Sequence, residues 1–203
     1  MTKLVHYPHQ LHSILHRNCF WLGAFTQEEC DKICSYYDAK NLEQGTTGTN
    51  NEIDNKYRQS NVYLEKYDQN SAWIFNRLFE IIDDANHKFF QFELVGFDFF
   101  QYTTYNVNQY YNYHIDTVYN HYEGNRDSNL CRKLSLSILL NDPNEFEGGE
   151  FEICIGDPAE PESNKLNKGD AIFFPSYMLH RVKGITRGIR KSLVVWVLGP
   201  KWR

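Results

Sequence analysis

Hydrophobic residues change their spacing about halfway along the chain, and the change predicts helices first and strands afterwards. The sequence Thr26-Gln27-Glu28-Glu29 has the form of a capping box, so a helix is expected from there through Tyr37. Apolar residues recur at helical spacing over residues 71–88 and predict a second helix. Residues 20–25 are typical of a short strand. Residues 41–55 have no apolar period and predict a loop.

Beyond Gln91 the chain is rich in the aromatic and β-branched residues that strands favour. Strands are expected at residues 92–94, 97–102, 110–116, 133–140, 150–155, 171–174, 178–183 and 190–198. Turn-forming residues separate them, and no helical pattern lies between neighbouring strands, which excludes parallel βαβ units. The pattern predicts a mainly β fold with flanking helices (α+β), in which an antiparallel sandwich or jelly roll packs against N-terminal helices.

The length of 203 residues is ordinary for one domain. We therefore expect a single domain over residues 1–203, with a helical support region at about 20–90 and a β core at about 92–200. The aromatic share of 16% and the charged share of 23% are those of a folding sequence and not of a disordered one.

Charge and cysteine content restrict the partners and the compartment. The formal net charge of -5 argues against tight nucleic-acid binding, because affinity for phosphates comes mainly from Lys and Arg. The five cysteines form no C-x-x-C pair, and an odd number is a poor basis for a disulfide framework. The sequence has neither the apolar run of a signal peptide nor the roughly 20 apolar residues of a membrane helix. We expect a cytoplasmic protein with reduced thiols and no membrane partner.

His114 and Asp116 end a segment rich in tyrosine. If this segment is extended, positions i and i+2 point to the same face, so the two side chains project together. One imidazole and one carboxylate supply two ligands of a 2-His-1-carboxylate site, which leaves open positions on a non-haem Fe(II). The best candidate for the third ligand is His180, on a later strand.

His180 and Arg190 flank a connection centred near Ile185, and a hairpin with its turn there would place them roughly opposite each other. On Fe(II), 2-oxoglutarate can occupy two open positions and O₂ the last. The distal carboxylate of 2-oxoglutarate then needs a buried cation, and the guanidinium of Arg suits bidentate carboxylate binding. We assign this role to Arg190, because Arg187 is nearer the turn and is expected to be solvated.

Three motifs in the second half of the chain resemble a known family. Tyr105 begins a Y-x8-H-x-D segment that ends at Asp116, residues 148–151 read G-G-E-F, and His180 and Arg190 form an H-x9-R segment. Over roughly residues 92–200, this set resembles the prolyl 4-hydroxylase group of the Fe(II)/2-oxoglutarate-dependent dioxygenases.

The resemblance implies a double-stranded β-helix core in which His114, Asp116 and His180 bind Fe(II), while Arg190 and Tyr105 bind the distal carboxylate of 2-oxoglutarate. It also implies O₂ as cosubstrate, ascorbate as a supporting reductant, and a prolyl residue in a peptide or protein as substrate.

The chain departs from the family pattern at two positions. Asn108 replaces a glycine that is common in the family, and Arg190 stands where collagen-type members have Lys, which argues against a collagen-type substrate.

Other residues near these motifs have two interpretations each. Tyr111 and Tyr113 alternate with the metal ligands and pack either beside the site or within the sheet. Trp196 is six residues from Arg190 and would lie on the same face of a strand. It could therefore line the iron site, although packing in the core is favoured. Ser135 and Ser137 either line the cosubstrate pocket or face solvent.

Two further histidine groups are weaker metal candidates. Residues 117–129 follow the ligand strand and are placed to act as a lid, and His121 within them is a disfavoured fourth ligand, because three protein ligands already leave the open positions that O₂ and cosubstrate need. His9, His12 and His16 would share one helix face, but no carboxylate or thiol lies nearby in the sequence.

The sequence thus predicts a dioxygenase that hydroxylates a C–H bond and releases succinate and CO₂. A free amino acid or another small molecule would need no change at the iron site and stays an alternative substrate. A non-catalytic jelly-roll protein that only binds metal is disfavoured, because such a protein has no use for Arg190. The oligomeric state does not follow from the sequence.

Overall fold

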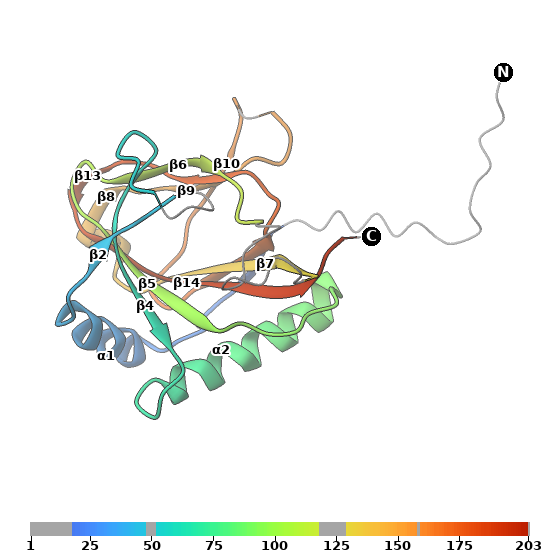
Figure 1. Ribbon diagram of the computed structural model, residues 1–203. Coiled ribbons are helices and arrows are strands. Elements are labelled where there is room, and N and C mark those ends of the chain that lie inside the picture. The colour runs from blue at the N-terminus through green and yellow to red at the C-terminus, as the bar shows by residue number, and fades with distance from the viewer. Residues whose placement is uncertain (1–17, 48–51, 118–128, 158, 203) are drawn as a thin grey trace, which may run out of the picture.

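The computed structural model describes residues 18–47, 52–117, 129–157 and 159–202. Two facing β-sheets form the centre of this part of the chain, and two helices lie against the outer side of one of them (Figure 1). The helices are α1 (Gln27–Asp38) and α2 (Ala72–Ala85), which continues into a π-helical turn (Asn86–Phe90). None of these helices has the length and apolar content needed to cross a membrane.

The predicted start of α1 is confirmed. The side chain of Thr26 accepts a hydrogen bond from the backbone N–H of Glu29, and the Glu29 carboxylate accepts one from the backbone N–H of Thr26, which completes the capping box. The second predicted helix is also present, but its regular part ends at Ala85 and the π-helical turn follows.

The larger sheet contains seven strands in the order β1-β11-β7-β14-β5-β4-β2. Their bounds are β1 (Cys19–Trp21), β2 (Glu43–Gln44), β4 (Asn61–Lys66), β5 (Phe99–Tyr105), β7 (Leu130–Leu139), β11 (Ala171–Pro175) and β14 (Arg190–Pro200). Both helices lie along its outer face in Figure 1.

The smaller sheet contains five strands in the order β10-β9-β12-β6-β3. Their bounds are β3 (Arg58–Gln59), β6 (Tyr110–His114), β9 (Phe151–Ile153), β10 (Glu162–Asn164) and β12 (His180–Val182). A further pair joins β8 (Phe146–Gly148) to β13 (Ile185–Gly188), and a short 3-10 turn (Pro143–Glu145) precedes β8. All of these strand pairs are antiparallel, which confirms the predicted fold class.

One predicted strand is absent. Residues 92–94 do not form a strand, because the Asn86 side chain hydrogen-bonds both the N–H and the C=O of Phe92 and so replaces a strand partner. The region expected to be helical support contains β4, which pairs with β5 along its whole length. The remaining predicted strands are present with shifted ends.

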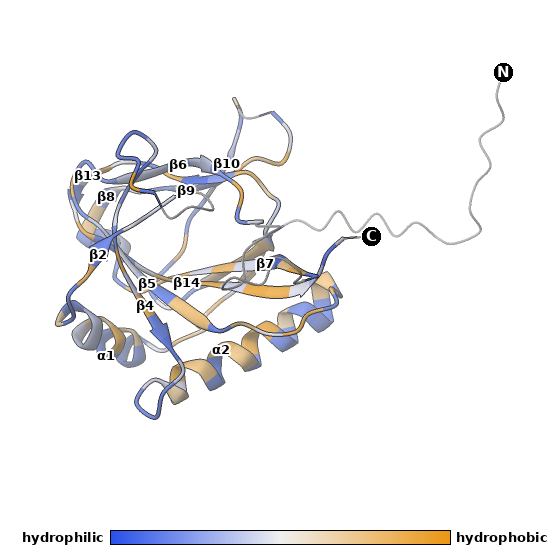
Figure 2. Ribbon diagram, in the orientation of Figure 1, coloured by the Kyte–Doolittle hydropathy of each residue, from blue (hydrophilic) through white to orange (hydrophobic). Residues whose placement is uncertain are grey.

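The alternation of side chains along β14 separates two environments. Leu193, Val195 and Val197 belong to the apolar core that also includes the buried residues of α1 and α2. Figure 2 shows apolar segments on β14, β5 and α2. The alternate positions Arg190 and Ser192 are buried on the opposite face, toward the smaller sheet.

The neighbouring strand β7 repeats this division. Leu134, Leu136 and Ile138 join the core beneath the helices. Ser135 and Ser137 alternate with them and are also buried, which contradicts the alternative that they face solvent. The larger sheet therefore has a strongly apolar outer face and an inner face that carries buried polar groups between the two sheets.

Gly169, just before β11, lies against the backbone of Phe25, just before α1, and a substitution there tests how closely these two segments pack. Gly169 has a φ of +89°, and a Cβ atom there would lie 2.2 Å from the carbonyl oxygen of Phe25. We expect Gly169→Ala to lower the free energy of unfolding by at least about 2 kcal/mol, because both backbone strain and a clash arise. Chemical denaturation measures this. Gly156→Ala, which enters open space, is the control, and equal stability of the two variants would contradict this packing.

Candidate active site

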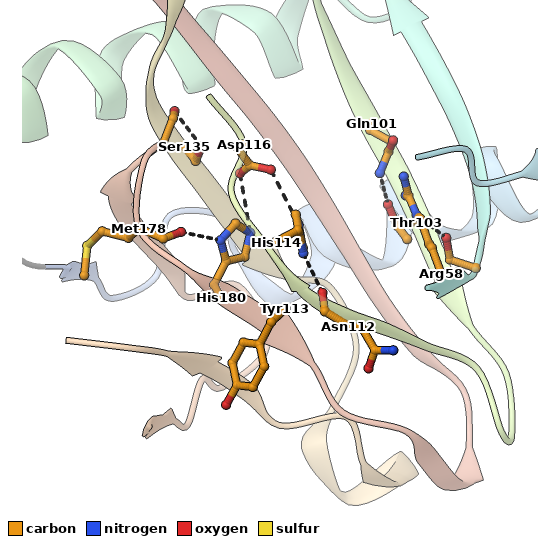
Figure 3. A network of polar contacts seen from close by, with 12 residues as sticks. Arg58, Gln101, Thr103, Asn112, Tyr113, His114, Asp116, Ser135, Met178 and His180 are labelled. Carbon is orange, nitrogen blue, oxygen red and sulfur yellow. Dashed lines mark hydrogen bonds and ion pairs between the residues drawn. The ribbon is translucent and has the colours of Figure 1, made fainter. Parts of the chain in front are cut away.

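Two paired strands of the smaller sheet bring the predicted histidine ligands together. His114 at the end of β6 and His180 at the start of β12 are direct partners in the antiparallel register. Asp116 lies beyond the end of β6, so the prediction that it belongs to the strand was wrong. The backbone N–H of Asp116 donates to the carbonyl of Ser176 at 2.8 Å, which holds the carboxylate beside the two imidazoles (Figure 3).

The three side chains form a compact cluster of possible metal ligands. One donor atom from each of His114, Asp116 and His180 lies within 4.8 Å of the others. The Nε2 atom of His114 is 3.6 Å from one carboxylate oxygen of Asp116, and the Nε2 atom of His180 is 3.5 Å from the other. Asp116 and His180 are buried, with 6% and 3% of their surfaces exposed.

Hydrogen bonds on the far side of each imidazole determine its tautomer. The Nδ1 atom of His114 is 2.8 Å from the carbonyl of Asn112, and the Nδ1 atom of His180 is 2.9 Å from the carbonyl of Met178 (Figure 3). A carbonyl only accepts, so each Nδ1 carries the hydrogen, and in the neutral tautomer that this selects, the Nε2 lone pair points toward Asp116. Two lone pairs and a carboxylate that converge in this way suit a divalent metal ion.

The charge states of the cluster agree with metal binding. Burial, together with the proximity of His180, lowers the pKa of His114 to about 3, which keeps the ring neutral at physiological pH. Burial acts to raise the pKa of Asp116, but His180, His114 and Arg132 outweigh it and hold that pKa below its usual value. His114 therefore presents a neutral imidazole and Asp116 an ionised carboxylate, the forms in which these groups bind metals.

Tyr111 covers one side of the cluster. Its ring stacks on the imidazole of His114, with ring centroids 3.5 Å apart and planes inclined by 13°. Of the two interpretations given for this tyrosine, packing beside the site is correct. Tyr113 instead lies under the guanidinium of Arg181 at 4.3 Å and points away from the cluster in Figure 3.

Arg190 and Tyr105 face each other on the larger sheet. They are register partners between β14 and β5, and the guanidinium carbon lies 6.0 Å from the centre of the phenol ring. Their exposed fractions are 3% and 4%. Burial raises the pKa of the Tyr105 hydroxyl, which therefore stays protonated and can donate a hydrogen bond.

The hairpin that was predicted to bring Arg190 opposite His180 is wrong. His180 and Arg190 are not partners in one hairpin, because β12 belongs to the smaller sheet and β14 to the larger, and β13 lies between them in the chain. Space for the Arg190 side chain is provided by Gly149, where a Cβ atom would lie 3.0 Å from Cδ of Arg190. The expectation that Arg187 is solvated is confirmed, since it pairs with Glu147 at the surface.

Two arginines near the cluster were not predicted. Arg58 comes from the two-residue strand β3, and its guanidinium lies 4.6 Å from the ring centre of Tyr111. Arg132 on β7 lies 4.2 Å from the ring centre of Trp196, whose Nε1 atom is enclosed without a hydrogen-bond partner among the described residues. Strand periodicity gives no signal for either arginine, because a two-residue strand has no period and Arg132 lies beside an irregularity in the β7–β14 pairing.

Two earlier candidates cannot be placed. Of the lid predicted at 117–129, residues 118–128 with His121 lie outside the described residues, as do the N-terminal residues His9, His12 and His16.

Residues 100–198 match the family model described as the 2OG-Fe(II) oxygenase superfamily. Over these residues the chain is similar to that superfamily. The match includes His114, Asp116, His180, Arg190 and Tyr105, the residues named by the sequence motifs, and it confirms the predicted resemblance.

Two curated relatives match a shorter stretch of this chain. A PKHD-type hydroxylase from Psychrobacter sp. is 47% identical over 64 residues, which cover 32% of this chain and 24% of the relative. A PKHD-type hydroxylase from Xylella fastidiosa is 42% identical over 74 residues, which cover 36% of this chain and 31% of the relative. The matched stretch thus spans no more than about a third of either relative's length.

Solved structures share the fold of this chain over nearly its whole length. A Pseudomonas putida prolyl-4-hydroxylase superposes with a TM-score of 0.69 at 17% identity, covering 92% of this chain and 94% of the other. A Trichoplax adhaerens prolyl hydroxylase, solved with a peptide fragment of hypoxia inducible factor, gives a TM-score of 0.70 at 16% identity, with coverages of 91% and 84%. At these identities the likeness concerns the fold.

Loss of either histidine should remove metal binding. We expect His114→Ala and His180→Ala each to weaken Mn(II) affinity by at least about 100-fold, because two remaining ligands cannot hold the ion as three do. Calorimetry measures the affinity. His87→Ala, which changes an exposed histidine, is the matched control and should bind as the unaltered protein does. Equal affinity in all variants would place the metal elsewhere.

The metal-free protein should lose stability in mild acid through His114. The pKa of this ring is about 3 in the folded protein and about 6.5 when unfolded, so between these values the unfolded state binds more protons. Its contribution is complete above pH 6.5 and is lost as the pH falls toward 3, by up to about 1.4 kcal/mol per pH unit. His114→Gln should have a correspondingly shallower pH dependence in denaturation experiments. Parallel curves for both proteins would contradict the assignment.

Proposed function

We propose that this protein is an Fe(II)- and 2-oxoglutarate-dependent dioxygenase that hydroxylates a C–H bond of a prolyl residue in a peptide or protein. The observation that carries the proposal is the arrangement inside the oxygenase core: a buried His-Asp-His cluster on one sheet and a buried arginine with a tyrosine hydroxyl on the other. A protein that only binds a metal ion would not need the buried arginine and tyrosine.

Each group has a defined task in this proposal. His114, Asp116 and His180 hold Fe(II), which supplies activation of O₂ coupled to decarboxylation of 2-oxoglutarate to succinate and CO₂. Arg190 binds the distal carboxylate of 2-oxoglutarate, and the Tyr105 hydroxyl donates to the same group, since a buried anion is stable only when several donors meet it. The apolar residues between the sheets exclude water from the reaction. Ascorbate serves as a supporting reductant.

The peptide substrate is supported by the relatives and not by a contact in the site. The matched proteins are called PKHD-type hydroxylases, and the similar structures are prolyl hydroxylases, one of them solved with a peptide. We also propose a cytoplasmic location, because all five cysteines are free thiols. The formal net charge of -5 argues against a nucleic-acid substrate.

Conservative changes at the cosubstrate pair test the proposal. Arg190→Lys removes the bidentate fork and should raise the KM for 2-oxoglutarate by about 10- to 100-fold. Tyr105→Phe removes one hydrogen bond and should raise it by about 5-fold. Succinate formed with Fe(II) and ascorbate is the readout.

Arg187→Lys is the matched control, because it changes a surface arginine and should leave the KM unaltered. If the unaltered protein neither forms succinate nor binds 2-oxoglutarate in the presence of Mn(II), the non-catalytic alternative is correct.

A further inference from the structure

The six arginines that the structure describes fall into two groups with opposite surroundings. Three partly exposed arginines each contact a carboxylate, at 3.4, 2.7 and 2.8 Å respectively: Arg77, Arg181 and Arg187. The other three come from strands near the metal cluster, and none forms an ion pair with a carboxylate of the described residues: Arg58 and Arg190, which are buried, and Arg132, which is half-buried. Proteins normally show the reverse, because an unpaired charge is costly when it is buried and cheap when it is solvated.

The proposed cofactors leave part of this positive charge unbalanced. Fe(II) brings two positive charges, which Asp116 and the proximal carboxylate of 2-oxoglutarate offset. The distal carboxylate of 2-oxoglutarate offsets Arg190. Arg58 and Arg132 then remain, and neither iron nor cosubstrate supplies an anion for them.

Arg58 is held rigidly in this environment. Only 6% of its surface is exposed, and it lies against the ring of Tyr111, which in turn stacks on His114. Its Nε donates to the Ser60 hydroxyl at 2.9 Å and its Nη1 donates to the Thr46 carbonyl at 2.8 Å. These partners are neutral, and the Nη2 atom makes no hydrogen bond to the described residues.

Gly45 allows this placement of Arg58. A Cβ atom at Gly45 would lie 2.6 Å from Nε and 2.8 Å from Cζ of Arg58. The backbone N–H of Gly45 donates to the Ser60 carbonyl at 2.8 Å, so the two segments cannot easily separate. Gly45 is therefore a positioning residue for the guanidinium.

Arg132 reaches the cluster from the opposite sheet. Its guanidinium rests on the face of Trp196 and makes no side-chain hydrogen bond to the described residues. The Thr117 hydroxyl, one residue after Asp116, donates to the Arg132 carbonyl at 3.5 Å, so Arg132 lies beside the chain segment that carries the carboxylate ligand. The unpartnered Nε1 of Trp196 adds another donor beside it. Arg58 and Arg132 thus approach the cluster from β3 and β7, on different sheets.

We propose that the substrate carries an anionic group, a carboxylate, close to the carbon that is hydroxylated, and that Arg58 and Arg132 bind it. This inference rests on the proposed function and narrows its substrate class. The carboxylate comes from an acidic residue next to the proline of a peptide, or from the α-carboxylate of a terminal or free amino acid. Charge-assisted hydrogen bonds to a guanidinium favour this group strongly over a neutral amide.

Matched pairs of small probes test the inference on the protein loaded with Mn(II) and 2-oxoglutarate. One pair is acetyl-Gly-Glu-Pro-Gly amide and its Gln counterpart, a second is acetyl-Gly-Pro-Glu amide and its Gln counterpart, and a third is acetyl-Gly-Pro with a free carboxylate and with an amide. We expect the carboxylate member of at least one pair to bind at least about 10-fold more tightly in calorimetry, equivalent to about 1.4 kcal/mol. The preferred pair identifies the source of the carboxylate, and the preference should decline with added salt.

Variants identify the residues responsible. Arg58→Gln, Arg132→Gln and Gly45→Ala should each reduce the preference to less than about 3-fold, because each removes or displaces one guanidinium. Arg187→Gln should retain the full preference. Retained affinity for 2-oxoglutarate in each variant shows that the site has folded.

The outcomes separate this inference from the proposed function. If 2-oxoglutarate binds and no pair shows a preference for the carboxylate, the inference is wrong while the proposed function stands. The same conclusion follows if Arg58→Gln and Arg132→Gln keep the preference. If 2-oxoglutarate itself does not bind, the proposed function fails, and the inference fails with it.

Discussion

The pairing of β6 with β12 is the constraint on which the site depends. This register places His114 opposite His180, and a hydrogen bond from the backbone of Asp116 to Ser176 adds the carboxylate. The Nδ1 hydrogen bonds to backbone carbonyls then orient both rings, so the donor atoms converge. A slip of one residue in this register would turn one histidine to the other face of the sheet and separate the ligands.

The larger sheet supplies the charged and polar groups that face the metal ligands. The apolar outer face of the larger sheet packs against α1 and α2, which stabilises the sheet and leaves its inner face available for polar groups. Arg190, Tyr105 and Arg132 occupy that inner side, opposite the metal ligands of the smaller sheet. Charges held between two sheets cannot be solvated as they would be in water, so they interact strongly with anions that enter.

Local patterns in the sequence identified the residues of the site, but they predicted less well how these residues are placed in space. His114 and Asp116 were found because residues two apart share a strand face, although Asp116 in fact lies beyond the strand and is held by a contact with Ser176 that no local pattern encodes. Arg190 was found for its charge and spacing, but the expected hairpin with His180 is wrong because sheet membership depends on contacts distant in the chain.

The missed elements have similar physical causes. Strand β3 contains two residues and therefore shows no period, so Arg58 could not be assigned to a wall of the site. Residues 92–94 look like a strand, but side-chain hydrogen bonds from Asn86 satisfy the backbone of Phe92 instead. The helices were predicted well, because the capping box of α1 and the apolar spacing of α2 are local signals.

A crystal structure of the protein with Mn(II) and 2-oxoglutarate, with the metal located by anomalous scattering, tests the central claim most directly. We expect one ion at about 2.0–2.3 Å from Nε2 of His114, Nε2 of His180 and a carboxylate oxygen of Asp116. We also expect the distal carboxylate of 2-oxoglutarate in contact with Arg190 and Tyr105. An ion bound away from these three side chains, or 2-oxoglutarate bound away from Arg190, would contradict that claim.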